Sequence, residues 1–215
     1  MRAFLLLAAA VAGALLAGAP AIAGPTLTFN LNQISDPGIG SGSQGTVVLT
    51  QVSNTVVDVR VSIAPDLFIN TGGPHTPFGF NNSLSGLSVS FVTPTSGIFA
   101  KGVLSYDPTG GQNTPYGTFG RAIDSSAGNG APGGYGGILD FTVTRALGLS
   151  TTDFGSTTGN DGQQYFFSAD VSNALGITGA IASRGPATPN VPEPTSIALI
   201  GTGLLGLGIN RRKRG

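Results

Sequence analysis

The segment TVVDVRVSIA, Thr55–Ala64, carries the pattern that decides the fold class. Apolar residues occupy every second position and polar residues stand between them: Val57, Val59, Val61 and Ile63 against Asp58, Arg60 and Ser62. In an extended strand successive side chains point to opposite faces. The segment therefore predicts a β-strand with one face in a core and the other face in solvent.

The same alternation recurs along the chain between Gly, Pro and Asn residues. Seven further candidate strands share it or have a β-branched and aromatic composition: 26–32, 46–52, 87–93, 97–106, 116–123, 138–146 and 163–171. Asn54-Thr55, between two apolar runs, predicts a hairpin turn. A helical turn is expected only within Leu147–Ser156, with Ser150 as its cap. Many short strands with turn residues between them predict an all-β fold, an antiparallel β-sandwich.

Four long segments are so rich in Gly, Pro and Asn that they are predicted as loops: 35–45, 70–82, 107–117 and 125–137. Loops of this length are either functional or mobile. We find no internal repeat and no second domain. The sequence therefore predicts one β-sandwich ectodomain with Gly-rich loops over residues 24–182, followed by a short linker over residues 183–190.

Composition excludes several classes of function. The chain has 215 residues, no Cys and a formal net charge of zero. Between residues 24 and 190, nine Asp stand against five Lys and Arg, a net charge of about −4 that offers no basic stripe for nucleic acid. The missing cysteines exclude a disulfide scaffold and a thiolate metal site. About 167 residues between the two ends are enough for one domain with a core.

The N-terminus, MRAFLLLAAAVAGALLAGAPAIAGP, has the organisation of a secretory signal peptide. Arg2 precedes an apolar stretch over residues 3–19, and Ala21-Ile22-Ala23 gives the small-x-small pattern that signal peptidase requires. Signal peptidase is thus predicted to cleave between Ala23 and Gly24 and to remove residues 1–23, which places the ectodomain outside the cytoplasm. An uncleaved membrane anchor is the alternative.

The C-terminus combines a short apolar run with four positive charges. Ile197–Ile209 would span about 20 Å as a helix, less than the roughly 30 Å hydrocarbon core, so bilayer thinning or snorkelling of the flanking arginines is needed. By the positive-inside rule the basic tail stays cytoplasmic: Arg211, Arg212, Lys213 and Arg214. The pattern predicts a single short transmembrane helix over 197–209. A buried core helix is the alternative, but nothing follows it to pack against.

Directly before the apolar run, two prolines hold the backbone extended in Val191-Pro192-Glu193-Pro194. This motif, continued by Thr195-Ser196, the Gly- and Leu-rich run and the basic end, resembles the PEP-CTERM sorting signal of Gram-negative bacteria. The resemblance covers residues 191–215, with the motif itself at 191–196. The Gly-rich β ectodomain also looks like those of many PEP-CTERM proteins, for which the family offers no settled activity.

The resemblance implies an exosortase, a membrane-embedded sorting enzyme, as partner, and a host that makes exopolysaccharide. It also implies a route: the protein is held at the inner membrane with its ectodomain in the periplasm, then passes to the cell envelope or the extracellular space. One further motif in the tail, the G-x-G-x-x-G of residues 201–206, lacks the acidic residue that a dinucleotide site needs about 20 positions later. No cofactor is predicted.

Few residues suggest catalysis or metal binding. His75 is the single histidine, lies in a predicted loop, and is expected to be a solvated side chain because no G-x-S-x-G accompanies it. Asp124, Asp153 and Asp161 could offer oxygen ligands to Ca²⁺, but turn roles fit them better. The segment 24–190 has no Glu, so a glycosidase-type carboxylate pair would need two of its nine Asp. No catalytic, cofactor-binding or metal residue is predicted.

The expected function is that of a non-catalytic envelope or extracellular-matrix protein associated with exopolysaccharide. One alternative is a carbohydrate-binding module that uses aromatic residues in or beside the loops: Tyr106, Tyr116, Phe119 and Tyr135. Such platforms favour Trp, which the chain lacks. A secreted Asp-based hydrolase is the other alternative. The consecutive aromatic residues 165–167 cannot all face one way, so part of this trio is expected in the core and part on the surface.

Overall fold

The computed structural model describes residues 24–69, 75–92, 96–99, 102–126 and 134–187. This part of the chain forms eighteen β-strands and two short 3-10 helices, without an α-helix, and all pairings between its strands are antiparallel. The predicted all-β, antiparallel fold class is therefore confirmed. The predicted signal peptide, 1–23, and the predicted transmembrane helix, 197–209, lie outside the described residues, and no described helix has the length and apolarity to cross a membrane.

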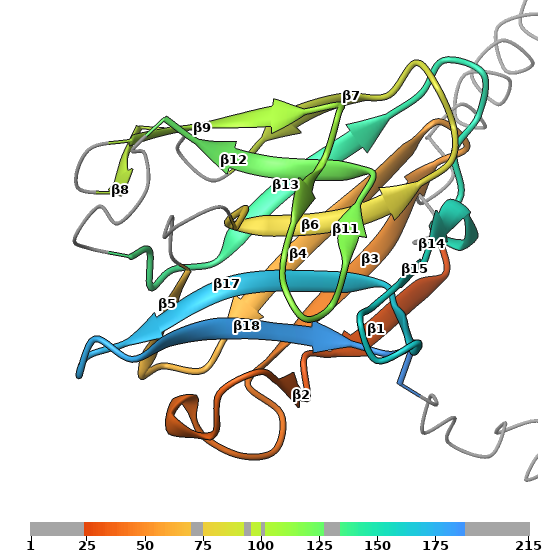
Figure 1. The fold of residues 1–215 in the computed structure, drawn as a ribbon. Coiled ribbons are helices and arrows are strands. Elements are labelled where there is room, and N and C mark those ends of the chain that lie inside the picture. Colours follow the sequence, from red (N-terminus) through yellow and green to blue (C-terminus); the bar gives the residue numbers. More distant parts are fainter. Residues whose placement is uncertain (1–23, 70–74, 93–95, 100–101, 127–133, 188–215) are drawn as a thin grey trace, which may run out of the picture.

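The first sheet has five strands. Its first edge strand lies beside the hairpin that was predicted around Asn54-Thr55. Its order is β1 (Thr26–Asn30), β3 (Gly45–Ser53), β4 (Val56–Ile63), β13 (Leu139–Thr144) and β7 (Ser88–Phe91). Asn54 and Thr55 form the turn between β3 and β4, as predicted. Figure 1 shows β3 and β4 of this sheet, in orange, passing behind the blue strands of the second sheet.

The second sheet has nine strands. Along its main path lie β2 (Gln33–Ile34), β18 (Thr178–Ser183), β17 (Phe167–Asn173), β6 (Phe78–Asn82), β12 (Arg121–Ser125), β9 (Gly102–Asp107) and β8 (Ser96–Phe99). Beside this path, β14 (Phe154–Gly155) pairs with β6 and β5 (Leu67–Ile69) pairs with β17. Two small hairpins complete the fold: β10 (Gly111–Gln112) with β11 (Thr118–Phe119), and β15 (Thr157–Thr158) with β16 (Gln164–Tyr165).

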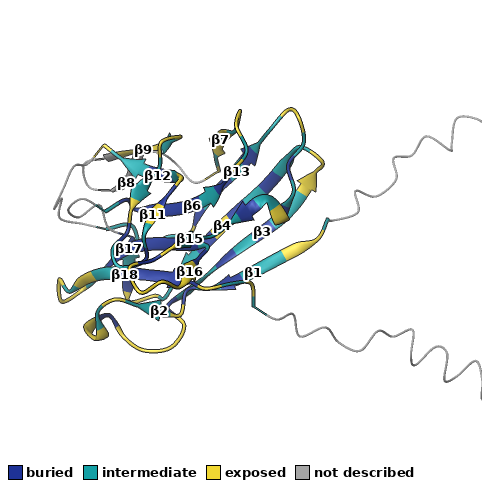
Figure 2. Ribbon diagram, turned by 45° about the vertical axis from the view of Figure 1, so that its right-hand side comes forward, coloured by how far each residue is buried: buried dark blue, intermediate teal, exposed yellow. Residues whose placement is uncertain are grey.

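The main core contains apolar side chains from both sheets. In β4, Val57, Val59 and Val61 are fully buried, as the alternation predicts, and Ile63 at the strand's end is partly buried against the core. Aromatic rings link the sheets: Phe78 of β6 meets Phe141 of β13 at 6.1 Å between centroids, and Phe29 of β1 meets Phe167 of β17 at 4.8 Å. Figure 2 shows the buried residues along the middle of the strands and the exposed ones at turns and strand ends. Burial of these two apolar faces is the main force that stabilises the fold.

A second, smaller cluster lies on the other face of the nine-stranded sheet. It contains Tyr116, Phe119, Tyr165, Ala180 and Ala182. Here the β10–β11 hairpin covers the sheet, and Phe119 lies directly over Gly79: a Cβ at position 79 would come within 2.8 Å of the Phe119 ring. The close contact therefore requires a glycine at position 79.

Two of the predicted loops contain strands. β6 lies within the predicted loop 70–82, and β10 lies within the predicted loop 107–117. In β6 the two buried phenylalanines alternate around Gly79 and Asn81, whose residue types suggested a turn. β18 was also not predicted, because the small Ala180 and Ala182 that pack under the tyrosines leave only Ile181 as a large apolar residue.

The predicted helical turn is confirmed. η3 (Thr151–Asp153) begins after Ser150, whose side chain accepts a hydrogen bond from the backbone N–H of Thr152, and Asp153 accepts one from the N–H of Ser150. The second 3-10 helix, η2 (Pro37–Ile39), begins after Asp36, which accepts from the N–H of Gly38. Both caps satisfy backbone donors that a short helix leaves unpaired.

Candidate functional site

The last described residues are held on the edge of β1. β18 ends at Ser183, Pro186 forms an antiparallel bridge with Phe29, and the N–H of Ala187 donates to the carbonyl of Thr28 at 2.6 Å. The predicted linker, 183–190, thus overlaps the end of a strand and a pairing with β1. We call Pro186 and Ala187 the strap.

Prolines determine how far the strap can extend. Because Ala187 donates toward β1, the nitrogen of Pro186 faces the opposite way, where a missing N–H costs no sheet hydrogen bond. If the pairing continued, residue 189 would have to donate to the carbonyl of Thr26, but residue 189 is a proline. The sequence therefore provides no donor for pairing beyond Thr188, two positions before the motif region begins.

The first described residue, Gly24, lies just before β1 and pairs with β3. The N–H of Gly24 donates to the carbonyl of Gln51 at 3.2 Å, next to the start of β1. Gly24 is also the residue that follows the predicted signal-peptide cleavage site. The first and last described residues therefore both lie next to β1. The other predicted sorting and processing residues lie outside the described part of the chain: Ala21, Ala23, Val191, Pro192, Glu193, Pro194, Arg211, Arg212, Lys213 and Arg214.

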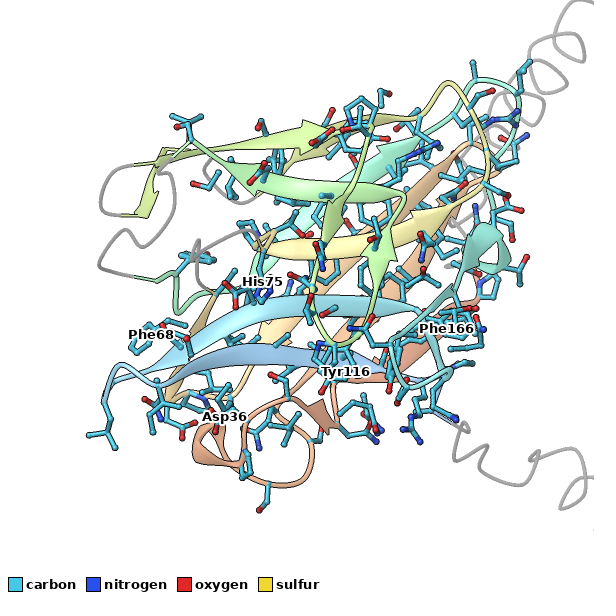
Figure 3. The ribbon with its side chains drawn as sticks, in the orientation of Figure 1. Asp36, Phe68, His75, Tyr116 and Phe166 are labelled. Carbon is cyan, nitrogen blue, oxygen red and sulfur yellow. The ribbon has the colours of Figure 1, made fainter. Side chains whose placement is uncertain are left out.

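His75 is closer to the interior than the sequence predicted. Its Nδ1 lies 3.8 Å from Oδ1 of Asp170, a buried carboxylate of β17, and its ring is one-quarter exposed. Figure 3 shows His75 beside β17. A neighbouring carboxylate favours the imidazolium, but burial has the larger effect and lowers the pKa of His75 from its ordinary value. Sequence reasoning missed Asp170 because a carboxylate within the strand FSADVSN gave no site pattern.

Polar groups surround this pair under the β10–β11 hairpin. The N–H of Thr76 donates to the carbonyl of Gln112, and the N–H of Asp170 donates to the carbonyl of Pro77. Asn113, which follows β10, is fully buried. Among the described residues, no group of three or more His, Cys, Asp or Glu side chains could hold a metal ion. The arrangement anchors the hairpin to the sheet.

Charged residues also gather on the solvent face of the five-stranded sheet. Arg60 donates to Oδ2 of Asp140 at 3.2 Å across the β4–β13 pair. Burial raises the pKa of the nearby Asp58 carboxyl, the Asp140 carboxylate raises it further, and Arg60 opposes the shift. Two carboxyl groups with one arginine thus share an open sheet face, and the described residues build no covering element over it.

The candidate calcium ligands have structural roles in the described residues. Asp153 belongs to the cap of η3, and Asp124 accepts from the N–H of Ser125. Asp161 accepts from the N–H of Gln163 and from the Tyr165 hydroxyl, the latter at 2.6 Å, and that hydrogen bond is the main reason why the pKa of Asp161 is lowered. These contacts fit the predicted turn roles.

Two of the four aromatic candidates for sugar stacking are buried. Tyr116 and Phe119 belong to the small cluster under the β10–β11 hairpin, and Figure 3 shows Tyr116 over β17 and β18. Tyr106 and Tyr135 are half-buried and pack against the main core. In the trio 165–167, Tyr165 and Phe167 are buried in different clusters, whereas Phe166 is half-buried against Phe29. The loops therefore do not present Tyr116 or Phe119 as a sugar platform.

Comparison with known proteins gives a result for the tail. The sequence model of the PEP-CTERM protein-sorting motif matches residues 190–214. No curated protein matches the chain, and no solved structure matches it. The resemblance seen in the sequence is thus confirmed, and it supports an exported protein that a membrane-bound exosortase sorts.

The pKa of His75 can be measured without ambiguity, because the chain has one histidine. We expect an NMR titration of its ring protons to give a value below the 6.5 of an unperturbed histidine. The unfolded chain then binds more protons, so the free energy of unfolding should fall as the pH drops below about 6.5. Replacement His75→Gln should remove that pH dependence. A measured pKa above 6.5 would show that the Asp170 contact outweighs burial.

We expect Asp58→Asn to stabilise the protein at pH 7, because the folded state disfavours the ionised carboxyl. Because the pKa of Asp58 is raised in the folded protein, the gain in the free energy of unfolding should be complete at pH values above that folded pKa. The gain should disappear as the pH falls through the folded pKa toward the pKa of the unfolded chain. Chemical denaturation at pH 7 and pH 3.5 measures both. In an Asp140→Asn background the gain should shrink, since one cause of the shift is gone. A loss of stability at pH 7 would contradict this account.

Proposed function

We propose that the protein is a secreted, non-catalytic component of the cell envelope or extracellular matrix that is associated with exopolysaccharide. Its two sheets form a β-sandwich ectodomain. A signal peptide over 1–23 is removed on export, and the segment 197–209 then holds the chain in the inner membrane until an exosortase acts on it. The observation that carries the proposal is the PEP-CTERM motif match at residues 190–214.

The contacts of the polar residues support a non-catalytic role. Arg121, half-buried between strands, donates to the carbonyls of Leu84 and Pro108. Arg145 donates to the carbonyls of Ser85 and Gly148. Both guanidinium groups, like the capping aspartates, are thus used to fix loops. Side chains committed to backbone groups in this way stabilise the fold and are poorly placed to move protons.

An array of hydroxyl groups supports the association with polysaccharide. The solvent face of the five-stranded sheet carries Thr and Ser side chains in cross-strand register: Thr26 opposite Thr50, Thr46 opposite Ser62, Thr142 opposite Ser90, and Thr144 opposite Ser88. Neighbouring strands place such groups about 4.8 Å apart. Hydroxyls at this spacing, with Asp58 and Arg60 between them, offer donors and acceptors to a polyhydroxylated chain.

The sorting motif is tested by Glu193→Gln and, separately, by deletion of residues 211–214. We expect each variant to remain as an unprocessed precursor in the membrane fraction, because the first changes the recognised motif and the second removes the charges that fix topology. Mass spectrometry of the ectodomain defines both processed ends. Asp66→Asn, the same chemical change on the exposed surface of the ectodomain, serves as the matched control. Normal processing and delivery of both tail variants would overturn the proposal.

The polysaccharide association is tested by retention of the ectodomain on exopolysaccharide purified from the host. The double variant Thr46→Val, Thr50→Val removes two hydroxyls from the five-stranded face with little change of shape, and we expect it to lose retention. Thr178→Val, on an exposed position of β18, should leave retention unchanged. If the unaltered protein passes through the column, the association is wrong. Equal retention of the unaltered protein, the double variant and Thr178→Val would instead show that the polysaccharide does not bind through these two threonines on the five-stranded sheet.

A further inference from the structure

Large exposed apolar side chains occur at both ends of the five-stranded sheet. Val52 is 61% exposed and Leu147 is 84% exposed, and both lie at the end of the sheet where β13 stops. Val92 and Ile138 lie where β13 begins, and the N–H of Val92 donates to the carbonyl of Asp140. The end with Val52 and Leu147 differs from the other end because Gly24, the first described residue, lies beside it.

Val52 and Leu147 are held outward by the backbone. The register of β3 and β4 shifts between Gln51 and Ser53, so Val52 occupies a β-bulge. Gly148, at φ +101°, closes a turn in which its N–H donates to the carbonyl of Arg145. Leu147 lies at the tip of this turn. Folding thus fixes two apolar side chains in solvent rather than leaving them on a loose loop. We call Val52 and Leu147 the apolar tip.

Hydrogen bonds join the two segments that carry the apolar tip. The N–H of Leu149 donates to the carbonyl of Asn54, and the N–H of Arg145 donates to the carbonyl of Thr55, both at 2.9 Å. The side chain of Gln51 adds a bond to the carbonyl of Leu149 at 2.7 Å and accepts from the N–H of Thr151. The hairpin and the 145–151 segment are therefore one rigid unit.

Both chain ends are directed toward this unit. Gly24 pairs with Gln51, the residue before Val52. Pro186 and Ala187 pair with Phe29 and Thr28 in antiparallel sense, so the chain at Ala187 runs toward the start of β1 and Gly24. Figure 1 shows the start of β1 and the blue end of the described chain on the same side of the molecule.

The tail keeps the ectodomain close to the membrane. Nine residues lie between Ala187 and Ile197, where the apolar run begins, so these two residues can be at most about 35 Å apart when the segment is fully extended. A domain of this size has a radius of gyration of about 15 Å. The β1 edge must therefore stay within about one domain diameter of the bilayer, with the apolar tip at the end to which both termini point.

We propose that the apolar tip contacts the lipid bilayer while the tail anchors the protein, so that the ectodomain stands on the membrane in one orientation. The proposal rests on the proposed function, since it requires the inserted tail. Exposed aliphatic side chains partition into the acyl boundary. Arg145, in the same turn as Leu147, adds a positive charge to this unit.

The absence of cysteine makes the test direct, because each introduced cysteine is a unique labelling site. The substitutions are Val52→Cys and Leu147→Cys, with Val92→Cys, 64% exposed, and Leu175→Cys, 85% exposed, as controls on the other end and on the β17–β18 turn. The full-length, tail-bearing protein is labelled with a polarity-sensitive fluorophore and reconstituted in phosphatidylethanolamine–phosphatidylglycerol vesicles that contain nitroxide-labelled lipid. We expect the lipid to quench labels 52 and 147 but not labels 92 and 175.

Equal quenching at all four positions, quenching at the control positions alone, or no quenching would each overturn the orientation. If labels 52 and 147 are quenched in vesicles without exosortase and lose this quenching when exosortase is added, the result still supports lipid contact in the absence of the enzyme. Protection of these labels only when the enzyme is present would replace the lipid with a protein partner and overturn the proposal. Flotation of the vesicles separates the two hypotheses: protein that fails to float contradicts the inserted tail, whereas floating protein with an unquenched tip contradicts only this inference.

Discussion

The fold depends on the burial of two apolar sheet faces against each other, fixed by period-two alternation. A shift of one residue in the register of β4 would move its valines into solvent and bring Asp58 and Arg60 into the core. The aromatic contact between Phe78 and Phe141 joins interior strands of the two sheets, β6 and β13. Because this core is formed by the middle of the strands, the strand ends and outer faces can carry polar residues without cost to the fold.

The sequence predicted the strands whose alternation is driven by the main core, and failed where a second layer is present. In β18, Ala180 and Ala182 are small because tyrosines cover them, so the strand has little hydrophobic signal of its own. In β6, Gly79 is required by the ring of Phe119, a residue 40 positions away, yet a glycine and two asparagines within five residues suggest a turn. Both errors arise from contacts between distant segments, which a local pattern does not contain.

The candidate site divides in the same way. The sorting residues form a continuous motif, so the sequence alone identified them, and the family match agrees. The strap could not be predicted, since the pairing of Ala187 with Thr28 joins residues from opposite ends of the chain. The neighbourhood of His75 and Asp170 was missed for the same reason. A continuous motif can be recognised in the sequence, whereas contacts between residues far apart in the chain become visible only in the folded structure.

The strap also has a consequence for self-association of the protein. A sheet edge with free donors and acceptors templates the addition of a strand from a neighbouring molecule, and repeated addition gives fibrils. On this edge the strap occupies the carbonyl of Thr28, and the outward nitrogen of Pro186 has no hydrogen to offer a newcomer. The strap therefore blocks strand addition at this position of the β1 edge.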